Sequence, residues 1–176
     1  AYPSSGAPHP HDQFVRRSEL WFQDLPAALA AVHGNMGLWA PSQPGVPGFR
    51  EFECMFMAEK PEYDLLRDVP PQHYKYMTLP MWWPHGQPVI DENIEIFIHT
   101  YVLSYREDIA TADAEDYYLG HHTREGKQLP GMQHYLTWKS IRVPDVAGMV
   151  IQPNKYYRLT ELGMSPESYT AVMIND

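Results

Sequence analysis

Cysteine, positive charge and long apolar runs are all scarce in this sequence, and each scarcity excludes a class of protein. Cys54 is the only cysteine in 176 residues, so neither an intramolecular disulfide nor a zinc site built from several thiolates can form. Thirteen Lys and Arg stand against 22 Asp and Glu, and the resulting net charge of −9 is unsuited to nucleic acid phosphate. The longest apolar stretches, 79–83 and 146–151, are far shorter than the roughly 20 residues of a membrane-spanning helix.

The motifs that mark common catalytic and nucleotide sites are also missing. The chain has no Gly-x-Ser-x-Gly, no Gly-x-x-x-x-Gly-Lys-Ser/Thr and no Gly-x-Gly-x-x-Gly. Cys54 is flanked by Phe52, Met55 and Phe56, surroundings that are typical of a buried, unreactive thiol. We therefore predict no cofactor, and the sequence favours a non-enzymatic role.

Proline and aromatic residues are abundant. The 17 prolines are about twice the ordinary usage, and 12 Tyr, 6 Phe and 5 Trp make up 13% of the chain. Residues 1–11 combine three prolines with a glycine and two serines, which predicts an extended N-terminal arm. Prolines and glycines also predict long irregular loops at 35–50 and 70–89. We expect residues 12–176 to form one compact domain that carries both loops.

Apolar periodicity predicts a mainly α fold with long irregular proline-rich segments. A stripe at three- and four-residue steps runs from Ile94 to Tyr105 and predicts a helix over 91–107, although its isoleucines also allow a strand at 94–98. Further helices are expected at 12–33 (one kinked helix or two short ones), 62–68, 110–120, 132–141, 155–162 and 165–174. The stretch 50–59 fits a strand or a helix. An α+β fold with a small sheet is the alternative.

The loops suggest that this chain acts by binding other polypeptides. Ordering each residue costs about 1–2 kcal/mol, and segments with so little apolar content need contacts with a partner to offset that cost. Aromatic residues and methionine are enriched in the cores of protein interfaces. The residues expected at the interface are Tyr2, Pro3, Pro8, Trp39, Met81, Trp82 and Trp83. We interpret the chain as a non-catalytic structural or accessory subunit of a larger multisubunit assembly, with other protein subunits as its partners.

The expected setting is intracellular, peripheral to the mitochondrial inner membrane, in a complex of the respiratory or ATP synthase type. This expectation rests on the first residue being Ala1 rather than Met, which suggests processing, and on Trp82 and Trp83, whose rings suit contact with a membrane surface. No targeting signal is visible in the chain. The location therefore follows from a preference among assemblies, not from a motif.

The alternative function is an α+β enzyme or ligand-binding domain with a His/Glu site. His121 and His122 are adjacent, and Glu95 and His99 are four residues apart, which places them on one face if 91–107 is helical. Imidazole and carboxylate both bind transition metals, so Glu95, His99 and His121 or His122 are the candidate ligands. Against this site, neither His-Glu-x-x-His nor Glu-x-x-His occurs, and a hydrogen-bonded structural histidine is commoner beside an apolar stripe.

Overall fold

The computed structural model describes residues 17–35, 53–67, 93–127, 129, 131–145 and 152–169. They belong to two compact units. The first unit holds the described residues of Met57–Ile141 and Tyr156–Asp176, and the second holds those of Pro3–Phe56 and Arg142–Lys155. The predicted arm at 1–11 and the predicted loops, apart from Asn35, lie outside the described residues. The division into one arm and one domain therefore stays a prediction.

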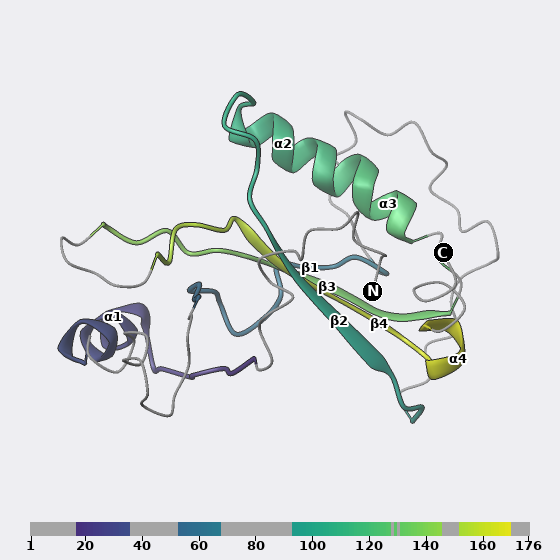
Figure 1. The fold of residues 1–176 in the computed structure, drawn as a ribbon, viewed down its shortest axis with the longest axis horizontal. Helices are drawn as coiled ribbons and strands as arrows, with labels where there is room; N and C mark the ends of the chain where they lie inside the picture. The colour runs from purple at the N-terminus through teal and green to yellow at the C-terminus, as the bar shows by residue number, and fades with distance from the viewer. Residues whose placement is uncertain are drawn as a thin grey trace, which may run out of the picture. The chain divides into compact units, whose positions relative to one another are not determined.

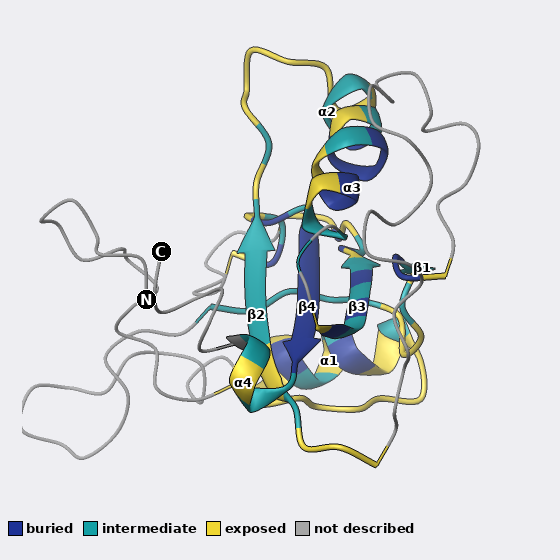
Figure 2. Cartoon of the chain, turned by 90° about the vertical axis from the view of Figure 1, so that its right-hand side faces the viewer, coloured by how far each residue is buried: buried dark blue, intermediate teal, exposed yellow. Residues whose placement is uncertain are grey.

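A four-stranded antiparallel sheet with the order β1-β3-β4-β2 forms the framework of the first unit. Its strands are β1 (Tyr63–Asp64), β2 (Phe97–Leu103), β3 (Met132–Lys139) and β4 (Arg158–Met164). Strand β4 pairs with β2 on one side and β3 on the other along its whole length, and every one of its residues is buried (Figure 2). The prediction of a mainly α fold is therefore wrong. In that prediction an α+β fold with a small sheet is only the alternative.

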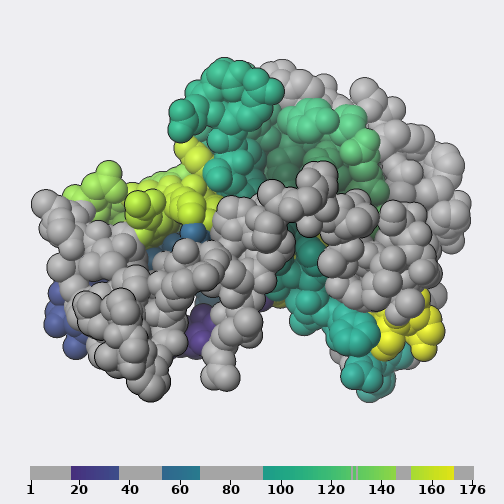
Figure 3. Space-filling view, viewed as in Figure 1, coloured from purple at the N-terminus to yellow at the C-terminus, as the bar shows by residue number. Residues whose placement is uncertain are grey.

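A continuous helical run lies across one face of the sheet (Figure 1). It consists of α2 (Thr111–Tyr117), the π-helical turn η4 (Tyr118–His122) and α3 (Thr123–Gly126). The helix predicted at 110–120 is thus confirmed, and Asp113 in its first turn suits the positive end of the helix dipole. In Figure 3 the teal and green atoms of this run form part of the molecular surface.

The hydrophobic core of the first unit lies between this helical run and the sheet. Its buried members are Leu65, Leu66, Tyr118, Leu119, Met132, Tyr135, Leu162 and Met164. Because side chains alternate along a strand, Leu162 and Met164 share the helix-facing side of β4 with Arg158 and Thr160. Each leucine buried here stabilises the fold by roughly 1.5–3 kcal/mol. The same face therefore carries both the apolar core and a buried polar cluster.

Four segments that the sequence analysis assigned to helices form strands. Strand β2 replaces the helix predicted at 91–107, β3 the one at 132–141 and β4 the one at 155–162, while 62–68 contains β1 and a turn. In β2, the β-branched residues Ile98, Thr100 and Val102 favour extended backbone. In β4, helix propensities differ by roughly a few tenths of a kcal/mol per residue, too little to compete with pairing on both sides.

Two segments predicted as helical, 12–33 and 165–174, contain short helices. In the second unit, α1 (Leu25–Gly34) follows the cap residue Asp24, whose Oδ1 accepts the N–H of Ala27 at 2.8 Å, but residues 17–24 are not helical. In the first unit, α4 (Pro166–Tyr169) follows Ser165, whose Oγ accepts the N–H of Ser168 at 3.3 Å. Residues 53–59 contain only an isolated bridge between Met57 and Ser140. Within the described parts of the chain, no helix has the length and apolar character needed to cross a bilayer.

Candidate functional site

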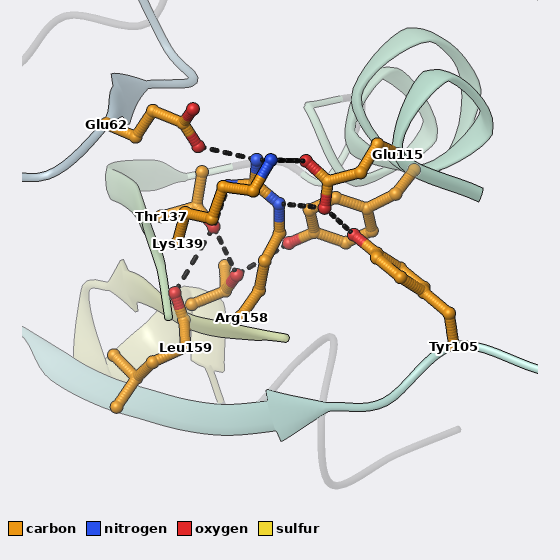
Figure 4. Close-up of polar contacts among 9 residues, drawn as sticks. Glu62, Tyr105, Glu115, Thr137, Lys139, Arg158 and Leu159 are labelled. Atoms are coloured by element: carbon orange, nitrogen blue, oxygen red, sulfur yellow. Dashed lines mark hydrogen bonds and ion pairs between the residues drawn. The ribbon is translucent and has the colours of Figure 1, made fainter. Parts of the chain in front are cut away.

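A buried arginine at the start of β4 is the centre of a polar cluster between the sheet and α2 (Figure 4). Arg158 is 0% exposed. Its Nε donates to Oε1 of Glu115 at 2.8 Å and its Nη2 to Oε2 at 2.6 Å, so the carboxylate on α2 accepts through both oxygens. Nη2 also donates to Oε2 of Glu62 at 2.5 Å. The rings of Tyr63 and Tyr118 lie 5.9 and 5.8 Å from the guanidinium carbon.

The charges of this cluster balance. Nζ of Lys139 lies 3.3 Å from Oε2 of Glu115, so two cations face two carboxylates. Burial by itself would raise the pKa of Glu115, but the hydrogen bonds and the charge of Arg158 outweigh it and lower that pKa. Burial likewise opposes the charge of Arg158, whereas Glu115 raises its pKa by more. Both groups are therefore ionised at neutral pH, and the pair ties β4 to α2.

Hydroxyl groups continue the cluster beneath the helical run. The hydroxyl of Tyr118 lies 2.6 Å from Oγ1 of Thr160, which lies 2.9 Å from Oγ1 of Thr137. The hydroxyl of Tyr101 on β2 lies 3.4 Å from that of Tyr118. Burial raises the pKa of both tyrosines, so these phenols are neutral at physiological pH. They serve as hydrogen-bond donors and acceptors, not as bases.

The turn η4 presents two histidine rings, each stacked on the tyrosine four residues before it. The ring centroids of Tyr117 and His121 are 4.9 Å apart, and those of Tyr118 and His122 are 5.6 Å apart. Although His122 is exposed on η4, partial burial of its ring lowers its pKa and outweighs the opposite effect of Glu125. π-helical turns occur frequently at functional sites. A neutral imidazole stacked on a phenol is chemically able to accept and return a proton.

The metal ligands suggested by the sequence do not converge. Glu95 is exposed ahead of β2, His99 is half-buried on β2, and only the neighbours His121 and His122 are held together, on η4. No group of three or more His, Cys, Asp or Glu in the described ranges is placed to hold a metal ion. The ring of His99 instead packs beside Tyr101, with 5.9 Å between ring centroids, and burial lowers its pKa.

Comparison with known proteins does not assign a role to these residues. No family model, no curated protein and no solved structure matches this chain.

An apolar surface is exposed in the second unit. Leu20, Trp21 and Phe22 are 61%, 68% and 40% exposed, in a segment without helix or strand that leads into α1. In the first unit, Phe97 and Ile98 of β2 are also exposed. The interface residues predicted from the sequence all lie outside the described residues: Tyr2, Pro3, Pro8, Trp39, Met81, Trp82 and Trp83. The predicted interface thus stays a prediction.

Sequence reasoning missed the arginine cluster. Arg158, Glu62 and Tyr118 are 40 or more residues apart from one another, so no local motif joins them. A signal did exist at β4, because a period of two through 158–164 places Arg158 and Thr160 on one face with Leu162. The helix predicted at 155–162 does not place these three residues on one face.

Proposed function

We propose that this chain is a non-catalytic subunit that acts by binding other polypeptides in a larger assembly. The supporting observation is the run Leu20, Trp21 and Phe22, three consecutive large apolar side chains that are all exposed. Trp and Phe in such positions are typical of interface cores, where burial of one large side chain contributes roughly 1.5–3 kcal/mol. Membership of a mitochondrial inner-membrane complex remains a prediction from the sequence.

The test is the native mass of the full chain in an extract of its own cells. We expect size-exclusion chromatography to place the chain in a complex well above its own 20.4 kDa. A Trp21→Ser, Phe22→Ser double variant should shift it toward the mass of the monomer, because the interface loses two apolar contacts.

A matched control separates binding from folding. The variant Gln23→Ser changes an exposed polar residue of the same segment and should leave the complex intact. Both variants should keep the melting temperature of the unmodified chain. A chain that elutes only as a monomer from a fresh extract would contradict the proposal.

A second candidate function, an enzyme or ligand-binding domain, is favoured by one specific observation. The turn η4 stacks His122 on Tyr118, and the hydroxyl of Tyr118 continues to Thr160 in the buried cluster. This pairing of a low-pKa imidazole with a phenol suits acid–base chemistry. Of the four residues in the predicted His/Glu site, this second candidate function uses only His122, and it does not require a metal ion.

Histidine titration by nuclear magnetic resonance tests this second candidate. We expect His122 to lose its proton at a lower pH than a free imidazole, and Tyr118→Phe to leave the stacking in place. Diethyl pyrocarbonate should then acylate His122 at mildly acid pH, because the neutral ring is the nucleophile. An ordinary or raised pKa for His122 would remove the observation on which this candidate rests. Metal analysis of the purified chain tests the metal version separately.

A further inference from the structure

The two carboxylates on Arg158 are held very differently. Glu115 uses both oxygens, its side chain is 8% exposed, and it also accepts from Tyr105 and pairs with Lys139. Glu62 contacts Nη2 through one oxygen, and its side chain is 32% exposed. Solvent screening weakens a partly exposed pair compared with a buried one. Glu62 is therefore the exchangeable partner and Glu115 the permanent one.

The backbone at Glu62 allows its side chain to leave without dismantling the sheet. The N–H of Glu62 donates to the carbonyl oxygen of Thr137 at 2.8 Å, and the N–H of Leu65 donates to that of Tyr135 at the same distance. These bonds and the register of β1 on β3 hold the main chain whatever rotamer the glutamate adopts. Departure of the carboxylate therefore needs only rotation about side-chain bonds.

The position that the carboxylate of Glu62 leaves beside Arg158 favours binding of an anion. Without Glu62, one carboxylate would remain for the fully buried guanidinium and the nearby ammonium of Lys139. A buried donor left without its partner is destabilising, and more so when it is charged. A carboxylate is the acceptor that satisfies both the N–H of Nη2 and the missing charge. Water can satisfy the hydrogen bond but not the charge.

We propose that Arg158 and Lys139 form a binding site for a small organic carboxylate, which Glu62 closes from within the chain. The site is open when Glu62 rotates outward, and the carboxylate of the ligand then takes the hydrogen bond from Nη2. This inference is independent of the binding role proposed for Leu20, Trp21 and Phe22, which lie in the other unit.

Chemical rescue with acetate tests the site. Glu62→Ala should lower the melting temperature, and sodium acetate should restore it with saturation, whereas sodium chloride at equal ionic strength should not. The half-saturating acetate concentration should be at least about tenfold lower in Glu62→Ala than in the unmodified chain, because the internal competitor is gone. Glu59→Ala, which removes another exposed glutamate from the same segment, should show no such difference.

Two results would overturn the proposal. One is an equal effect of acetate and chloride on the melting of Glu62→Ala. The other is an Arg158 Nε–H resonance in the unmodified chain that does not move at saturating acetate. The resonance measurement needs no substitution, so the proposal stays testable if Glu62→Ala fails to fold.

Discussion

The buried charge of Arg158 constrains the charged side chains around it. Its guanidinium is fully buried, and the doubly hydrogen-bonded Glu115 keeps it ionised there. A buried pair of this kind adds little net stability when intact, because desolvation opposes the attraction. Breaking it is costly, since the remaining charge stays buried. The pair therefore specifies how α2 sits on β4 more than it strengthens the fold.

Replacing Glu115 by glutamine should destabilise the protein severely. The variant keeps the shape but leaves the buried guanidinium with one partly exposed carboxylate, so we expect the free energy of unfolding to fall by about 3–5 kcal/mol. Urea denaturation measures it. The control Asp108→Asn removes an exposed carboxylate paired with Arg106 at 2.5 Å and should cause no measurable change. Equal effects of the two substitutions would refute the structural role of the cluster.

The same carboxylate predicts how stability depends on pH. Arg158 lowers the pKa of Glu115 in the folded chain below its ordinary value of 4.5. A lowered pKa contributes stability that is fully present above the unfolded value and is lost as the pH falls through the folded value. The unmodified chain should therefore lose stability on acidification below about pH 4.5. Glu115→Gln should lack that component, which melting curves across this range would show.

Cys54 should be unreactive while the second unit is folded. Burial, with a smaller contribution from Glu53, raises the pKa of its thiol from 9.0 to about 11. At pH 8 the thiolate fraction is then about 100-fold smaller than for an unperturbed cysteine, and alkylation by iodoacetamide should slow in proportion. Urea should restore the ordinary rate. Rapid alkylation of the folded chain would contradict the raised pKa of this half-buried thiol.

Two glycines, one ahead of β3 and one at the end of α1, differ in how strongly the local structure requires them. Gly131, ahead of β3, has a φ of 75°, and a Cβ there would lie 1.9 Å from Oγ of Ser168 in α4. By contrast, a Cβ on Gly34 at the end of α1 meets nothing within 4 Å. One glycine is required by backbone geometry and by a close approach, and the other is not.

Alanine at these two glycines should act in opposite directions. Gly131→Ala should destabilise by about 1–3 kcal/mol, because a left-handed conformation is strained for alanine and Ser168 must move. Gly34→Ala should be neutral or stabilise by up to about 1 kcal/mol through helix propensity. Thermal unfolding of the two variants beside the unmodified chain checks both signs. A neutral Gly131→Ala would mean that the turn before β3 adopts another conformation.

The helix start at Ser165-Pro166 could be predicted from the sequence, but the types of the elements in the sheet could not. The Ser165-Pro166 pair acts within a few residues, so its effect shows locally. The cap Asp24 acts just as locally, but it lies inside the helix predicted at 12–33. The type of β2 is decided by β4, more than 50 residues away in the chain, and the type of β4 by β2 and β3 together. The spacing of apolar residues indicates which positions are buried, but it does not indicate which strand pairs with them.

For the molecule as a whole, net charge and exposed apolar surface have opposite effects on association between copies of the chain. The net charge is −9 with neutral histidines, and protonation of the nine imidazoles on acidification brings the net charge toward zero at the isoelectric point, about pH 5.4. Repulsion between copies therefore weakens on mild acidification. The exposed side chains of Leu20, Trp21 and Phe22 are then free to associate.

Aggregation should consequently peak near pH 5.4 and depend on this apolar run. Light scattering between about pH 5 and pH 8 should rise toward the isoelectric point, and the Trp21→Ser, Phe22→Ser variant should scatter severalfold less there. The charge of the two chains is identical, so the difference isolates the apolar contribution. Identical scattering from both would show that other surfaces drive association.

The single cysteine, the net negative charge, the helix at 110–120 and the helix start at Ser165 could all be predicted from the sequence, because each depends on composition or on neighbours within a few residues. The central position of β4 and the contacts of Arg158 with Glu115 and Glu62 could not be predicted in this way. Those contacts join residues far apart in the chain, and they exist only once β2 and β3 have paired on either side of β4.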